Sequence, residues 1–119
     1  MSHDLYRKAA AAAASPRDAE YRAIAEATRR LMEANSAGRD LRALIAAVHF
    51  NRELWARLGR DCADDRNRLA PELRARVIAL ARWVNAYSSE AVRARKSLTP
   101  LIDLNRIVMD GLAGRASAA

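Results

Sequence analysis

Apolar positions recur at helical spacing over four long stretches of the chain. In residues 16–34 they fall on one stripe and the charged residues lie elsewhere, as in a helix with one buried face. In residues 71–96 they step by four and three residues in turn, which is typical of a helix that packs along one seam. No run alternates β-branched and polar residues in the manner of a strand. The pattern therefore predicts helices and no sheet.

Proline and glycine mark where these helices begin and end. Pro16, Pro71 and Pro100 each precede a stretch of apolar periodicity, and proline is favoured in the first turn of a helix. Gly111 and Gly114 follow the last stretch, so we expect the final helix to end there. We predict main helices over residues 16 to about 35, about 40 to 62, 71 to about 96 and 100 to about 112.

Length and composition agree with one helical domain. The chain has 119 residues, enough for a single core, and 51% of them are apolar, with alanine, the best helix former, the most frequent. We therefore predict an all-α fold, a small helical bundle of about four main helices preceded by a short helical segment over residues 4–14. We expect a single domain over residues 1–119, in which residues 1–14 and 114–119 fray.

The second predicted helix has an unusually wide apolar surface, an arc of roughly 200 degrees at about 100 degrees per residue. Such a helix either lies in the middle of a bundle or keeps one side for a partner. Asn51 and Arg52 share this surface with Trp55, and we expect Trp55 and Trp83 in the core. Polar groups placed there need hydrogen-bond partners, either inside the fold or on another protein. The sequence leaves both alternatives open.

A short pattern on this helix recurs near the C-terminus. Residues 48–54 (V-H-F-N-R-E-L) and 102–108 (I-D-L-N-R-I-V) share the order apolar, any, apolar, Asn, Arg, any, apolar. We therefore expect Asn51 and Asn105 to play similar roles. In the internal alternative, the two amides hydrogen-bond to each other.

The chain contains few residues that could support catalysis or bind a metal. His3 and His49 are isolated, and Cys62 is the only cysteine. No phosphate-binding glycine loop, metalloprotease motif or nucleophile elbow occurs. We predict no enzymatic activity, no cofactor and no metal. Because no stretch is apolar enough to span a membrane or to act as an export signal, we expect a cytoplasmic protein without membrane insertion.

The charge of the chain raises the question of nucleic acid as a partner. The formal net charge is +7, and residues 70–99, with six basic and two acidic residues, carry +4 of it. RNA recognition, however, uses aromatic rings exposed beside the basic groups, and here the aromatic residues mostly lie on apolar seams. We do not expect direct contact with nucleic acid to be the main activity.

Four segments, which lie within residues 6–22, 51–55, 67–73 and 101–112, carry a shared set of motifs in a fixed order and spacing. With these motifs the chain resembles the bacterial flagellar biosynthesis regulator family FlaF over nearly its whole length. The departures are mild: Asp103 stands where glutamate is usual, and Ala70 where leucine is frequent. The matching segments are Tyr6, Ala9 and Ala10 followed by Ser15-Pro16-Arg17 and Glu20-Tyr21-Arg22; Asn51-Arg52 with Leu54-Trp55; residues 67–73 (N-R-L-A-P-E-L); and residues 101–106 (L-I-D-L-N-R) with Gly111-Leu112.

This resemblance implies a small helical cytoplasmic protein needed for flagellin production and filament assembly. It also implies that the protein acts on flagellin itself, as a chaperone-like partner, in concert with the flagellin-translation regulator FlbT. Our main hypothesis is that the free apolar surface takes an amphipathic flagellin helix in a groove. The residues that we predict to bind the partner are Asn51, Arg52, Leu54, Trp55, Asn105 and Arg106.

Two other hypotheses belong to different classes. The chain could regulate flagellin after transcription by binding its messenger RNA, in which case added salt should weaken binding steeply. Alternatively, the same apolar surface could form a homodimer that ignores flagellin. Sedimentation with and without flagellin separates the dimer from the main hypothesis.

Overall fold

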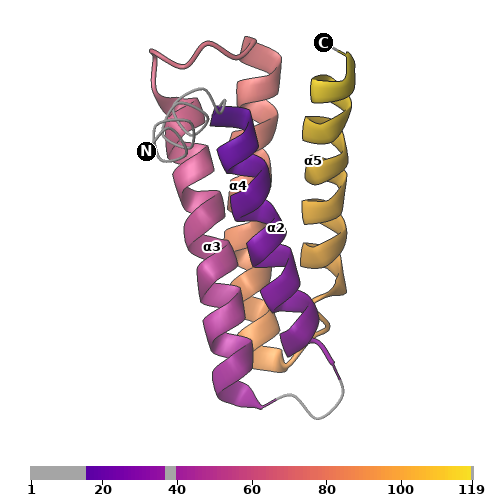
Figure 1. The fold of residues 1–119 in the computed structure, drawn as a ribbon. Coiled ribbons are helices and arrows are strands. Elements are labelled where there is room, and N and C mark those ends of the chain that lie inside the picture. Colours follow the sequence, from indigo (N-terminus) through magenta and orange to yellow (C-terminus); the bar gives the residue numbers. More distant parts are fainter. Residues whose placement is uncertain (1–15, 37–39, 119) are drawn as a thin grey trace, which may run out of the picture.

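The computed structural model describes residues 16–36 and 40–118, and the side-chain environments of residues 18–36 and 40–112. These residues form four α-helices: α2 (Pro16–Ala34), α3 (Leu41–Ala63), α4 (Pro71–Ala94) and α5 (Thr99–Ala118), as Figure 1 shows. No strand occurs in the described ranges, so the predicted all-α fold with four main helices is confirmed. The helical segment expected over residues 4–14 lies outside the described residues.

Local chemistry explains most of the helix ends. Pro16 and Pro71 are the first residues of α2 and α4, as their position before the apolar stretches predicted. Asp40 caps α3, because its Oδ1 accepts a hydrogen bond from the amide of Ala43 at 3.1 Å. α4 ends at Ala94, and the residue that caps it, Arg95, has a left-handed φ of 54°.

The predicted end of the last helix was wrong. α5 does not stop near residue 112 but runs through Gly111 and Gly114 to Ala118. A glycine inside a helix costs only about 1 kcal/mol relative to alanine, which is too little to end a helix among good helix formers such as leucine and alanine. The two glycines are therefore interior helix positions rather than a C-terminal cap.

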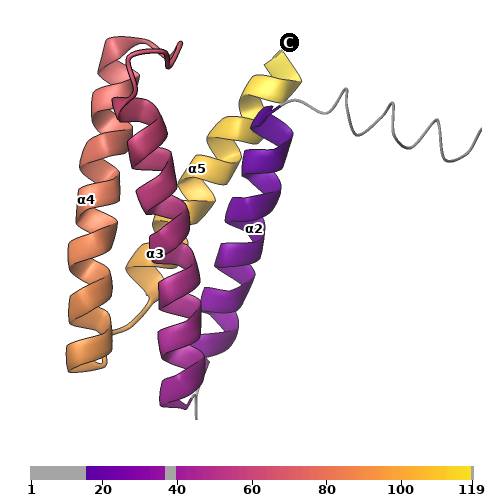
Figure 2. The same cartoon turned by 90° about the vertical axis from the view of Figure 1, so that its left-hand side faces the viewer.

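The four helices form a bundle with one open side. Close backbone packing joins α3 to α4, α2 to α3, and α2 to α5. α3 thus lies between α4 and α2, which explains its wide apolar surface and confirms the middle-of-the-bundle alternative. In Figure 2, α5 stays beside α2 but diverges from α4 toward the end of the bundle where α4 begins.

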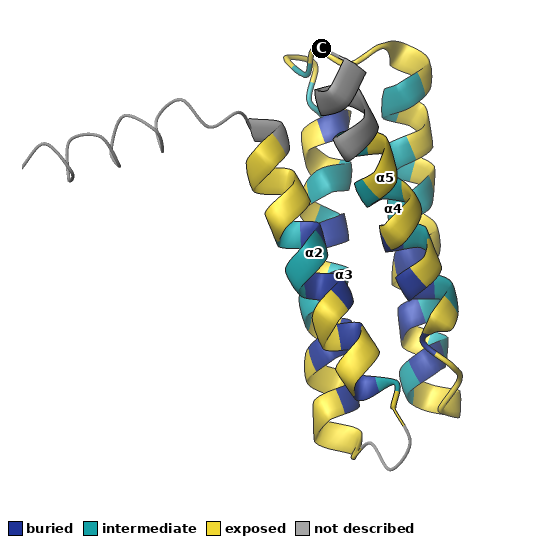
Figure 3. Cartoon of the chain, turned by 45° about the vertical axis from the view of Figure 1, so that its right-hand side comes forward, coloured by how far each residue is buried: buried dark blue, intermediate teal, exposed yellow. Residues whose placement is uncertain are grey.

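Buried residues lie along the facing sides of the helices (Figure 3). Leu31, Leu44 and Leu101 have no exposed surface, and Trp55 is only 2% exposed, so its predicted place in the core is confirmed. Trp83, which we also expected in the core, is 40% exposed and stacks on Tyr87 with 5.3 Å between the ring centroids. None of the described helices is long and apolar enough to cross a membrane.

Candidate functional site

A chain of buried side-chain hydrogen bonds links α3 to α5. Trp55 Nε1 donates to Asn105 Oδ1 at 2.9 Å, and Asn105 Nδ2 donates to Asn51 Oδ1 at 2.8 Å. Both asparagines have no exposed surface. A buried polar group left without a partner costs about 1 to 3 kcal/mol, so these three residues depend on one another. These hydrogen bonds therefore fix the position of α5 on α3, and the bond between the two amides is the one that the internal alternative predicted.

This polar chain ends in a group without a partner. Asn51 Nδ2 and Ser88 Oγ are buried and make no hydrogen bond to the described residues. Ser88 lies on α4 beside Ser89, which accepts a hydrogen bond from Arg52, the neighbour of Asn51. The two groups therefore lie at the same level of the α3–α4 contact, and the polar centre of the bundle is incompletely satisfied.

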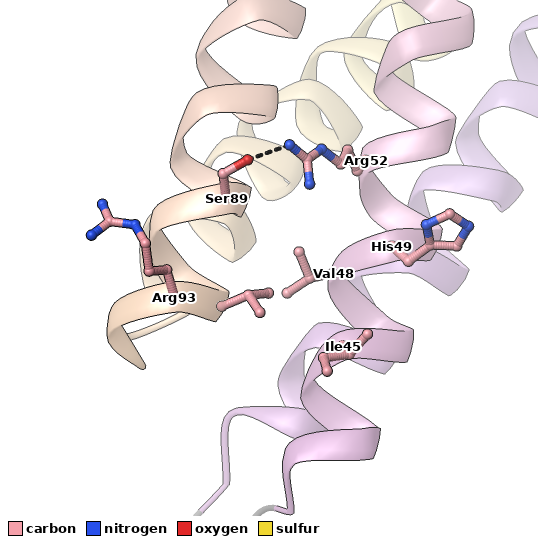
Figure 4. A pocket seen from close by; sticks show the side chains of 7 residues that line it. Ile45, Val48, His49, Arg52, Ser89 and Arg93 are labelled. Atoms are coloured by element: carbon pink, nitrogen blue, oxygen red, sulfur yellow. Dashed lines mark hydrogen bonds between the residues drawn. The ribbon is translucent and has the colours of Figure 1, made fainter.

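Arg52 joins α3 to α4 from the edge of the bundle. Its guanidinium donates to Asn85 Oδ1 at 2.7 Å, to the Asn85 carbonyl at 3.1 Å and to Ser89 Oγ. Figure 4 shows the Arg52 side chain extending from α3 to Ser89 on α4. Arg52 and Ser89 line an open pocket of about 350 Å³ between the two helices, which His49 and Arg93 also line. The guanidinium donors of Arg52 therefore hold α3 and α4 together.

The six residues predicted to bind a partner do not share one surface. Asn51, Leu54, Trp55 and Asn105 are buried, and Arg52 is half-buried against α4. Arg106 is exposed on α5 and contacts Met32 Sδ of α2 at 3.5 Å. The structure thus gives four of the six an internal place, and contact with a partner stays a prediction for all of them.

An apolar groove opens where α4 and α5 diverge, and we call it the α4/α5 groove. It encloses about 430 Å³ at the end of the bundle where α4 begins and α5 approaches its C-terminus. Its floor comes from α2 and α3, including Ile24, Trp55 and Leu58. The walls are Leu73, Arg76, Val77 and Leu80 of α4 and Ile107, Val108, Gly111 and Leu112 of α5.

Sequence reasoning missed this groove, which becomes visible only in the exposure of apolar residues in the structure. The apolar seam of residues 71–96 includes Leu73, Val77 and Leu80, and these three remain only half-buried in the structure. Ile107 is 68% exposed and lies outside the pattern that we had assigned to the last helix. The half-buried apolar residues of α4 and the highly exposed Ile107 of α5 therefore form an apolar surface that the described part of the chain does not cover.

Charges are sparse in the α4/α5 groove. Arg76 is exposed on the α4 wall and forms no hydrogen bond or ion pair with the described residues, and Glu20 of α2 lies at the floor. Burial raises the pKa of the Cys62 thiol, which also lines the groove, and nearby Asp61 adds to this effect while Arg74 opposes it. The thiol therefore stays protonated and unreactive near neutral pH.

No grouping of His, Cys, Asp and Glu suited to hold a metal ion occurs within the described ranges. Asp64 of the α3–α4 loop instead bonds locally: it accepts from the Arg66 guanidinium at 2.8 Å, and this contact holds the pKa of Asp64 below its usual range. Asp64 thus serves the turn that leads into α4.

Comparisons with known proteins give one family and no close relative. No curated protein and no solved structure matches the chain. The family model described as "Flagellar protein FlaF" matches residues 2–112, which is nearly the whole chain. The polar pattern that marks the resemblance, Asn51-Arg52 and Asn105-Arg106, is the one that ties α3 to α5 and α4. This chain therefore belongs to the FlaF family of flagellar proteins.

Proposed function

We propose that this FlaF family protein binds flagellin in the cytoplasm as a chaperone-like factor and supports flagellin synthesis, secretion and filament assembly, in concert with FlbT. Membership of the family supports a flagellar role. The single observation that supports binding of a flagellin helix is the α4/α5 groove, whose walls are apolar and unfilled by the described residues. We therefore propose this groove as the binding surface; its floor includes Trp55, one of the residues predicted to bind the partner, but not Asn51.

The shape and chemistry of the groove suit a helix. Amphipathic helices dock into apolar grooves through side chains spaced three, four and seven residues apart. Docking would remove Ile107 and the half-buried leucines of α4 from water, at about 25 cal/mol per Å² of apolar surface. Flagellin whose polymerising helices are covered in this way is withheld from polymerisation by mass action.

The groove favours a protein partner over RNA. Phosphate recognition relies on several basic groups acting together, and Arg76 is the one basic residue among those that line the groove in the described part of the chain. Titration with salt separates the two partners, because phosphate-driven binding weakens steeply as salt is added.

A direct test is to titrate purified flagellin monomer into the full chain by calorimetry and to follow filament growth from seeds with the chain present. We expect a complex with equal numbers of the two chains and slower growth in proportion to the flagellin bound. Absence of any complex at high micromolar concentrations would contradict the proposal.

A matched pair of variants separates docking in the groove from loss of fold. Ile107→Glu places a charge on the groove wall at a residue that is 68% exposed, so the fold should survive while flagellin binding is lost. Ile45→Glu makes the same change on α3, outside the groove, at a residue that is 45% exposed. We expect the Ile45 variant to bind flagellin as the wild type does.

A further inference from the structure

Gly111 is a feature that the isolated fold does not explain. It lies in the interior of α5, where glycine costs about 1 kcal/mol relative to alanine. A Cβ atom added at Gly111 would meet no atom within 4 Å. Nothing in the described part of the bundle therefore requires the absence of a side chain at this position.

Gly59 shows what a glycine required by the fold looks like. A Cβ atom at Gly59 would lie 2.9 Å from the Cβ of Ala81, so glycine is what allows α3 and α4 to approach each other there. Gly111 would likewise allow another backbone to come close to α5, but no described helix lies there. Because Gly111 lies on the wall of the α4/α5 groove, the neighbour that uses it would be the occupant of the groove.

Arg76 adds a second requirement on the occupant. It lies on the opposite wall, between Leu73 and Leu80, and has no anionic partner among the described residues. The guanidinium is always charged, and a carboxylate is the group that matches its donors in pairs. A helix that fits the apolar walls and also carries a suitably placed Asp or Glu would satisfy both features.

A second copy of this chain fits the groove poorly. Each copy carries a formal net charge of +7, so two copies repel. Within the groove, Arg76 on the α4 wall is positive and Glu20 at the floor is negative, so an acidic partner gains from the net charge of the whole chain and from a carboxylate placed at the Arg76 wall. The groove walls span residues 73–80 of α4, eight residues or about two helical turns, which sets the length of the contact.

We infer that the α4/α5 groove binds one amphipathic helix of flagellin, about two turns long at the contact, which passes with its backbone close to Gly111 and places a carboxylate against Arg76. This inference rests on the proposed function and adds the position and chemistry of the contact.

The test measures the affinity of purified flagellin monomer for the full chain and for two groove variants. Gly111→Leu fills the space over the α5 wall, and Arg76→Glu reverses the charge of the α4 wall. Each should weaken flagellin binding by about tenfold or more, because one removes the close approach and the other opposes the carboxylate. Both should keep the helical circular dichroism signal, since leucine and glutamate are good helix formers.

Matched controls place the same changes outside the groove. Arg82→Glu reverses a charge at an exposed position of α4, and Asp110→Leu adds the same side chain beside Gly111 on the outer side of α5. These controls should bind flagellin within about twofold of the wild type, since neither residue lines the groove.

The possible outcomes separate the two proposals. If wild-type chain does not bind flagellin, the proposed function fails and this occupant with it. If the wild type binds but Gly111→Leu and Arg76→Glu bind equally well, flagellin binding stands and the groove contact is overturned. If Gly111→Leu instead dissociates a homodimer seen in sedimentation, the occupant is a second copy and the inference is overturned. Restored binding of Arg76→Glu to a flagellin variant with one carboxylate changed to arginine would support it most strongly.

Discussion

The two sides of α4 differ in how completely the chain fills them. On the side facing α3, the helices approach so closely that a Cβ atom added at Gly59 would lie 2.9 Å from the Ala81 Cβ, and Arg52 donates hydrogen bonds to Asn85 and Ser89. On the side facing α5, a Cβ atom added at the corresponding glycine, Gly111, would meet no atom of another described helix within 4 Å. On the first side the two helices pack against each other completely. The second side has apolar residues of the kind that pack against a helix, but no described helix covers them.

The difference arises from where α5 is held. At its start, Leu98, Leu101 and Asn105 are buried, and the hydroxyl of Tyr87 on α4 donates to the Ser97 carbonyl at 2.6 Å. Beyond Asn105, α5 follows α2 and leaves α4, and Ile107 becomes exposed. The buried polar chain thus sets the tilt of α5 and, with it, the width of the groove.

The largest effect is expected where α5 is anchored. Asn105→Leu removes the partner of both Trp55 Nε1 and Asn51 Oδ1 in the core, and should lower the free energy of unfolding by about 3 kcal/mol. Urea unfolding followed by tryptophan fluorescence measures this loss. The control Arg106→Leu changes the next, exposed residue and should have little effect. Equal stability of the two variants would show that the polar chain does not anchor α5.

The next largest effect tests the closed side directly. Gly59→Leu forces α3 away from Ala81 and should lower the free energy of unfolding by about 2 kcal/mol, through overpacking. Gly111→Leu introduces the same side chain on the open side and should not destabilise the fold. Thermal unfolding of both variants measures the contrast, and similar losses would remove the distinction between the two sides.

A smaller effect of opposite sign is expected at the open side. Gly111→Ala should raise the free energy of unfolding by about 0.5 to 1 kcal/mol, because alanine is the better helix former and its Cβ meets open space. The measurement is chemical denaturation of the flagellin-free chain. A destabilised variant would mean that Gly111 serves the fold itself.

The smallest effect concerns an exposed ion-pair group on α2, remote from both sides of α4. Hydrogen bonds from Arg29, and then from Arg30, lower the pKa of Glu26 from 4.5 to about 2. A carboxyl whose pKa is lower in the folded chain stabilises the fold above its unfolded pKa and loses this contribution as pH falls through its folded pKa. The small stability difference between the wild type and Glu26→Gln should therefore be full above pH 4.5 and disappear near pH 2. Comparison of melting temperatures between pH 6 and pH 2 checks this.

Most of the fold was predictable because its signals are local. Pro16, Pro71 and Asp40 act within one helical turn, so the sequence alone places the starts of three helices. The predicted end of the last helix was wrong because a glycine that caps a helix and a glycine inside a helix cannot be told apart from the sequence. The predicted core position of Trp83 differs from the structure for a related reason: a residue beside an apolar seam is buried only if another helix covers that part of the seam, which the local sequence does not show.

The candidate site was less predictable than the fold. Periodicity placed Asn51 and Asn105 on apolar faces, where a polar group requires a partner, and the recurring motif paired the two residues. The bond between them was one of two open alternatives, and the structure contains it. Periodicity also identified which face of α4 is apolar but not that α5 leaves half of it open. That divergence depends on contacts between residues far apart in the chain, such as Trp55 with Asn105, which no local pattern encodes.

The most direct test of the account is a titration of the full chain, labelled at isoleucine methyl groups, with unlabelled flagellin monomer and followed by nuclear magnetic resonance. Ile107 lies on the groove wall and Ile45 on α3 outside the groove, so the two methyl groups report on different surfaces. The account predicts that flagellin shifts or broadens the Ile107 signal and leaves that of Ile45 in place. A shift at Ile45 with none at Ile107 would contradict it.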